Sequence, residues 1–227
     1  MGSFVSGAVT ATGANYTPAS STDNALVWLV YSYRPGTNAA SAQDFGGTSM
    51  TEEIDLTDNI TGNADPQSSM AWLENAGASS QTLSHTFSST PTFHDGWALT
   101  LENIDQTTPV NNTDSALINT HTDKITYSAV SGDVAVYYKF YAGTASPSFT
   151  TPTGFTLRYT DTVITSPAYR VLVIYTRDVD STETSTSLGA DSSGGSVAGG
   201  MQGVIVFNGS SGGAAGIPIF RRRIEGY

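Results

Sequence analysis

Cysteine is absent from this chain of 227 residues, and positive charge is scarce. Without cysteine there can be no disulfide, no thiolate metal ligand and no cysteine nucleophile. Only Lys124, Lys139 and seven arginines oppose 20 acidic residues, which leaves a formal net charge of −11. Such a surface repels a phosphate backbone at long range, so nucleic acid is not an expected partner.

Long apolar stretches and helical periodicity are also missing from the sequence. The first residues, MGSFVSGAVTATGAN, have neither a basic start nor a continuous apolar run, so we expect no signal peptide, no membrane span and no membrane partner. What the chain has instead is 28 Ser, 32 Thr and 23 Gly, with 23 aromatic residues as possible core. This composition favours strands and turns over helices.

Apolar runs with a period of two recur along the chain, with turn residues between them. A period of two places alternate side chains on opposite faces, as in a β-strand. So many strands in one chain imply two sheets packed face to face. The sequence therefore predicts an all-β, jelly-roll-like sandwich with strands at residues 25–33, 68–75, 81–88, 96–104, 133–141, 153–160, 168–176 and 203–208.

Two of these segments differ in their pattern. In DVAVYYKFY, residues 133–141, one set of alternate residues is wholly apolar and the other contains Lys139, which predicts one buried and one half-exposed face. In contrast VLVIY, residues 171–175, is apolar throughout, as is typical of a strand covered on both faces.

The chain also divides into two similar halves, residues 23–104 and 133–207. Each half opens with Asp and a long strand, continues through a glycine-containing turn and an aromatic strand, and closes with another apolar strand. We therefore predict a single β-sandwich domain over residues 1–208, built from two copies of one unit. Residues 209–227 are predicted to form a glycine-rich linker and an irregular basic tail.

The segment LENIDQTTPVNNTDSA, residues 101–116, lies between the two halves. Pro109 cannot donate to a strand ladder, and the residues 111–114, NNTD, are typical of a turn. The segment is therefore predicted to connect the halves rather than to carry catalytic residues. The glycine-rich stretches 192–200 and 209–216 are predicted to be flexible loops.

Enzyme motifs are absent: there is no G-x-S-x-G, H-E-x-x-H, P-loop or dinucleotide fingerprint. We predict no catalytic residue and no cofactor, with a hydrolase of an unrecognised type as a minor alternative. His85 and His94 are expected at the surface or at an edge. On a strand, His121 and Asp123 would share one face, although a metal site there would need two more ligands.

Two groups of acidic residues were weighed as sites. Asp178, Asp180 and Glu183 resemble an oxygen-rich Ca²⁺ loop, but an acidic solvated loop is the favoured interpretation and no metal is predicted. Glu52 and Glu53 are adjacent, so on a strand they would point to opposite faces, which does not suit a glycosidase pair.

Tyrosines recur at alternate positions in two of the predicted strands. Tyr31 and Tyr33 share one face, and so do Tyr137 and Tyr141. Exposed rows of this kind can stack sugar rings or form a protein interface, and buried rows would be core. The sequence leaves these alternatives open.

Three of the seven arginines stand together near the C-terminus, at Arg221, Arg222 and Arg223. A solvated tail is one interpretation of this run. The other, which we adopt for partner binding, is an anchor that docks on an acidic neighbour.

Several motifs resemble a family of β-sandwich domains from bacteriophage virion proteins and bacterial surface proteins. They are Phe45-Gly-Gly-Thr, Trp72-Leu73, residues 77–83 (GASSQTL) and Ile104-Asp-Gln-Thr-Thr-Pro109. The closing motif of that family reads G-V-D-Q-T-T-P, and here Asn103 replaces its glycine. The resemblance implies a jelly-roll-like sandwich that displays or decorates, and it implies no site residues.

From these features we expect a non-catalytic structural protein of a phage particle, either a capsid decoration (cement) protein or a tail or fibre component. Its partners would be copies of itself and other virion proteins, and it would assemble in the host cytoplasm without disulfides. The alternative is a carbohydrate-binding module that recognises a host glycan.

Overall fold

The computed structural model describes residues 1–9, 13–19, 23–34, 40–58, 65–87, 93–164 and 169–210. These residues form β-strands joined by turns, and no helix occurs among them, so the predicted all-β class is confirmed. It follows that they contain no helix able to cross a membrane.

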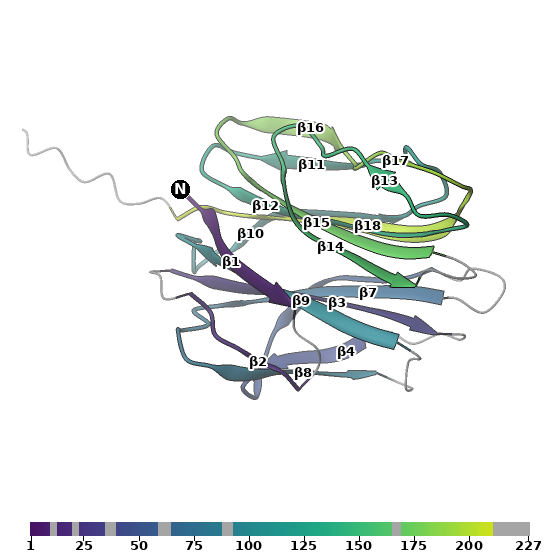
Figure 1. Ribbon diagram of the computed structural model, residues 1–227. Coiled ribbons are helices and arrows are strands. Elements are labelled where there is room, and N and C mark those ends of the chain that lie inside the picture. Colours follow the sequence, from purple (N-terminus) through teal and green to yellow (C-terminus); the bar gives the residue numbers. More distant parts are fainter. Residues whose placement is uncertain are drawn as a thin grey trace, which may run out of the picture.

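Two five-stranded antiparallel sheets form the centre of the molecule (Figure 1). The N-terminal sheet has the spatial order β1 (Ser3–Val9), β9 (Phe93–Glu102), β3 (Ala25–Arg34), β7 (Asp65–Glu74) and β6 (Thr51–Thr57). The C-terminal sheet has the order β10 (Val110–Leu117), β18 (Val197–Phe207), β12 (Val134–Gly143), β15 (Tyr169–Asp178) and β14 (Thr156–Ile164).

Smaller sheets cover the outer face of each large sheet, so Figure 1 shows four layers. The N-terminal cover has the order β2 (Asn15–Tyr16), β8 (Gln81–Phe87), β4 (Ala40–Phe45) and β5 (Thr48–Ser49). The C-terminal cover consists of two pairs, β11 (Ile125–Ala129) with β16 (Glu183–Leu188) and β13 (Ser148–Phe149) with β17 (Ser192–Ser193). The sequence predicted two sheets and missed these covers.

The strand order of the two large sheets is the same. Numbered within its own half, each sheet runs first, fifth, second, fourth, third. The predicted partner strands occupy matching places: β3 with β12, β7 with β15, and β9 with β18. The same chain path is therefore used twice, as the similarity of the two halves indicated.

Three cores separate the four layers. The central core lies between the large sheets, and Tyr31, Trp97, Tyr138 and Phe140 are among its buried members. Odd residues of β3 face this core, while even residues such as Trp28 face the N-terminal cover, in the two-residue period of a strand. The third core packs the C-terminal sheet against its cover.

This layering corrects the predicted half-exposed face of residues 133–141. Every residue of β12 is buried, Lys139 included, because the C-terminal cover packs on the face that was predicted to be half-exposed. The apolar strand β15 was predicted to be covered on both faces, and this is confirmed, since residues 170–176 are buried.

Two predicted turns or loops are strands. Residues 111–114 belong to β10, which pairs with β18. Residues 192–193 form β17, and residues 197–200 begin β18. At Gly200, where φ is 135°, an added Cβ would lie 2.2 Å from the carbonyl oxygen of Phe140. This glycine therefore permits close strand pairing rather than flexibility.

Candidate functional site

Both ends of the described chain meet the link between the halves at one end of the molecule, which we call the junction. It comprises Met1–Gly2, Asn103–Pro109, Val130–Asp133 and Asn208–Ser210. The amide of Gly2 donates to the carbonyl of Gly132 at 2.7 Å, and Ile104 forms a β-bridge with Gly209. A Cβ on Gly209 would lie 1.9 Å from the Gly132 oxygen, so three backbone segments pack here without intervening side chains.

The D-Q-T-T-P motif holds the junction together. The Asp105 carboxylate accepts hydrogen bonds from the amides of Thr107 and Thr108, at 2.7 and 3.0 Å, and these bonds lower the pKa of Asp105. Gln106 accepts from the amide of Asn75 at 2.9 Å. The motif therefore has a structural role, and the linking segment is a fixed connection.

Asn103 stands where the motif G-V-D-Q-T-T-P has its glycine. Its φ is 53°, which is the left-handed region that glycine and asparagine adopt most readily. Its carbonyl accepts a hydrogen bond from the amide of Ser210 at 2.6 Å. Asparagine can therefore replace glycine here without a change of backbone.

Asp133 is the buried centre of the junction. Its carboxylate accepts from Asn111 Nδ2 at 2.7 Å, from the amide of Val130 at 2.9 Å and from the amide of Gly209 at 3.3 Å. The carboxylate thus ties the first strand of the C-terminal half and the last described residues to one turn. Beyond Ser210 the chain continues into the predicted anchor, and Arg221, Arg222 and Arg223 lie outside the described residues.

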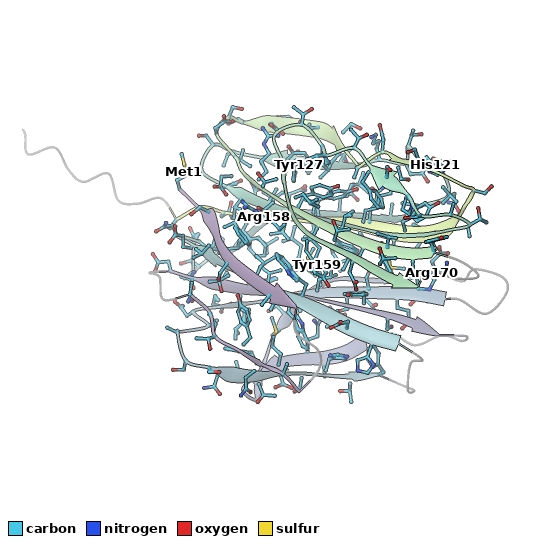
Figure 2. All side chains as sticks on the ribbon, viewed as in Figure 1. Met1, His121, Tyr127, Arg158, Tyr159 and Arg170 are labelled. Carbon is cyan, nitrogen blue, oxygen red and sulfur yellow. The ribbon has the colours of Figure 1, made fainter. Side chains whose placement is uncertain are left out.

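A second candidate site is a groove of about 410 Å³ in the C-terminal cover, here called the cover groove. One wall is the β11–β16 pair, and the other is residues 150–155, which lead from β13 to β14. Phe155 and Tyr127 line it, and their rings meet edge to face at 6.0 Å. Tyr127 lies in the outermost layer (Figure 2).

Ion pairs stand at both ends of the cover groove. At one end Arg177 pairs with Glu183, and the Tyr127 hydroxyl donates to Glu183 while accepting from Arg177 Nη1 at 2.8 Å. At the other end Lys124 pairs with Asp191 and donates to the carbonyl of Gly189 at 3.0 Å. The two cations and two carboxylates cancel, so the groove has no formal net charge.

Two of the acidic residues that resemble a Ca²⁺ loop, although no metal is predicted there, have protein partners. Glu183 is paired with Arg177, while Asp178 accepts from the amide of Phe4 at 3.3 Å, so these carboxylates have separate partners. Glu52 accepts from Ser69 and Glu53 from Trp72 Nε1, at 3.0 and 3.1 Å. Within the described ranges no three His, Cys, Asp or Glu residues gather as a metal site.

His121 and Asp123 lie in a turn instead of a strand, and they do not act together. The ring of His121 contacts Ser192 Oγ and the carbonyl of Gly195, each at 3.0 Å, while Asp123 accepts from the amide of Thr120 at 2.8 Å. His121 therefore fastens loops at the end of the molecule opposite Met1 (Figure 2), and Asp123 fixes its own turn.

His85 is half-buried instead of lying free at the surface. Its ring packs edge-on to Phe87 at 4.5 Å and against Trp28 at 5.2 Å. Burial, with a smaller contribution from His94, lowers the pKa of His85 to about 4. At neutral pH its imidazole is therefore an uncharged packing group.

The tyrosine rows are core, which removes them as sugar platforms. Tyr31, Tyr137 and Tyr141 are fully buried, and the side chain of Tyr33 lies outside the described residues. The Tyr31 hydroxyl donates to Asp161 at 2.8 Å across the two halves. Alternation could not reveal this, because the covering layers are distant in sequence.

Lys139 is a buried cation that the sequence did not single out. Its ammonium group donates to the carbonyls of Ala190 and His121, at 2.8 and 3.4 Å, and so fastens two loops to the C-terminal sheet. Burial, together with the charge of Lys124, lowers the pKa of Lys139 to about 8.

Stability should rise from about pH 8 and pass through a maximum near pH 10. Lys139 titrates near 8 when folded and near 10.5 when unfolded, so the unfolded chain binds more protons in this range and stability rises with pH. Above pH 10 the buried Tyr31, Tyr137 and Tyr138 keep protons that the unfolded chain loses, because burial raises their pKa, and stability falls.

Thermal unfolding from pH 7 to pH 11 measures this profile. In Lys139→Met the rise between pH 8 and pH 10 should disappear while the decline above pH 10 remains. A steady fall in melting temperature from pH 7 upward in the unmodified protein would contradict the assignment to Lys139.

Comparisons with protein-family models, with curated proteins and with solved structures found no match to this chain. The likeness to phage and bacterial surface domains therefore stays a prediction from the sequence motifs.

Proposed function

We propose that this protein is a non-catalytic structural protein that assembles through protein–protein contacts, as a capsid decoration protein or a tail or fibre component of a bacteriophage particle. The observation that supports assembly most directly is a pair of open sheet edges on one side of the molecule. Its place in a virion is supported by the motif resemblance alone.

The two open edges belong to β1 and β14. In the described part of the chain, β1 pairs with β9 alone and β14 with β15 alone. The strands lie close together, since the Arg158 guanidinium sits 4.1 Å from the ring centroid of Phe4 (Figure 2). Val5 and Leu157 are exposed on them, at 37% and 46%. An open edge with exposed apolar side chains is a template for strand pairing with another chain.

The other two edges are protected. Beside β10, the side chains of Asp114 and Asn112 accept from the amides of Thr126 and Ser128, so β11 blocks that edge. β6 carries Glu52, Glu53 and Asp55, and charge on an edge strand opposes pairing. The two large sheets therefore offer one side for assembly, and a second copy of this chain fits it by strand pairing.

Leu157→Lys should weaken association between copies at least about tenfold, because a lysine on the edge strand must be desolvated when another strand pairs there. Leu117→Lys is the matched control, since Leu117 is 41% exposed on the blocked edge strand β10 and its replacement should have no effect. Light scattering over a concentration series measures association, and incorporation into phage particles tests the virion role.

Both variants should keep the melting temperature of the parent, because both positions are exposed. An unmodified protein that stays monomeric at all concentrations and is missing from particles would overturn the proposal. Equal association by Leu157→Lys and the parent would overturn the assignment of the edge.

A further inference from the structure

The two halves carry depressions at equivalent places in the fold, and they have diverged. In the N-terminal half the depression holds about 210 Å³ and is lined by residues that include Phe45, Gly46 and Gln81. There the amide of Gly46 donates to the carbonyl of Thr82 at 2.8 Å, which draws the turn onto β8. The cover groove, between residues 150–155 and β16, holds about 410 Å³ and is the larger of the two.

Glycines hold both cations of the cover groove in position. Gly154 has a φ of 78°, and a Cβ there would lie 2.9 Å from Arg177 Nε. A Cβ on Gly189 would lie 2.7 Å from Lys124 Cδ and 2.8 Å from the carbonyl oxygen of Asp123. The side chain of each cation therefore packs against a glycine backbone, and the charged group at its end is paired with a carboxylate. Groups fixed in this way lose little entropy on binding a ligand.

Residues with side-chain hydroxyls make up much of the lining between the two ion pairs: Thr150, Thr151, Thr153, Thr186 and Ser187. Pro152, Leu188 and the largely buried Phe155 also line the groove. Paired guanidinium and carboxylate groups keep unused donors and acceptors, so they can bond to groups that both donate and accept. A sugar hydroxyl is such a group.

From these observations we propose that the cover groove binds a neutral carbohydrate of one or two residues. The neutrality follows from the charge balance of the groove, because an anionic or cationic ligand would have to compete with an ion pair already formed at each end. The volume lies within the range of small-molecule sites. The proposal is independent of the assembly role, because the residues that line the cover groove belong to neither β1 nor β14. The turn of residues 150–155 only leads into β14.

Thr153→Trp tests the proposal by filling the cover groove from an exposed position, and Thr48→Trp is its matched control. Thr48 is also exposed and lines the equivalent depression of the N-terminal half. The full chain is screened on an array of neutral and acidic glycans. Calorimetric titrations with the glycans that bind, and with galactose, glucose and N-acetylglucosamine, then compare the parent with both variants.

We expect a neutral glycan to bind the parent, and Thr153→Trp to weaken that binding at least about tenfold, which is about 1.4 kcal/mol. Thr48→Trp should bind as the parent does, with both variants unchanged in melting temperature. No binding by any glycan, equal binding by parent and Thr153→Trp, or an equal loss in Thr48→Trp would overturn the site. Binding of acidic glycans alone would overturn the assignment to a neutral ligand. Each outcome is independent of whether the protein assembles.

Discussion

Phe140→Ala is expected to lower the free energy of unfolding by about 3–5 kcal/mol, the cost of removing a large aromatic side chain from a packed core. Phe140 is fully buried in the central core, where its ring meets that of Tyr31 from the other half at 5.6 Å. The cavity would therefore open between the two halves, where the strands on each side are held in place by their own sheets.

Urea denaturation measures this loss, and Phe149→Ala is the control. Phe149 is half-buried in the short strand β13, edge-on to Tyr141 at 6.1 Å, so the same substitution should cost clearly less there. Both variants should unfold in one transition if the halves share the central core. Two separate transitions in the parent, or equal losses in the two variants, would contradict a shared core.

Asp133→Ala should cost about 2–4 kcal/mol, because three donors in and around the junction lose a buried charged acceptor. The donors are the amides of Val130 and Gly209 and the side chain of Asn111. Hydrogen exchange should show the location of the damage, since the amides of Val130 and Gly209 would lose protection while those of the central strands keep theirs.

Asp105→Ala is the control for this prediction. Asp105 also accepts two amide bonds, but these bonds are exposed, so water can replace the carboxylate and the loss should be clearly smaller than that of Asp133→Ala. If the two variants lost the same stability, burial of the Asp133 carboxylate would not be what holds the junction.

The positions of many strands, and the similarity of the two halves, could be predicted from local sequence pattern. Strand positions such as 25–33 and 133–141 follow from alternation and the similarity of the halves, because each residue's face in a strand depends only on its neighbours. Which faces are covered could not be predicted. The tyrosines of β3 and β12 alternate in the same way whether a second layer lies over them or not.

For the candidate sites too, the sequence showed residue types and spacing, whereas the partners of each residue depended on the fold. His121 with Asp123 and the carboxylates of 178–183 have a spacing that could suit metal binding, although no metal is predicted at either, and loop geometry gives these residues other partners. The cover groove was missed because Lys124, Phe155, Arg177 and Asp191 stand far apart in the sequence.

By itself, the sequence determined the β class, the repeated strand path and the lack of cysteine chemistry, because these depend on residue type and short-range periodicity. Only the tertiary structure decided that four layers stack, that the tyrosines and Lys139 are buried, and that two ion pairs come together in the cover groove. Such features arise from contacts between segments far apart in the sequence, such as Lys139 with Ala190 and Tyr31 with Asp161. Local pattern shows which residues share a face of a strand, but it does not specify which faces another layer will cover.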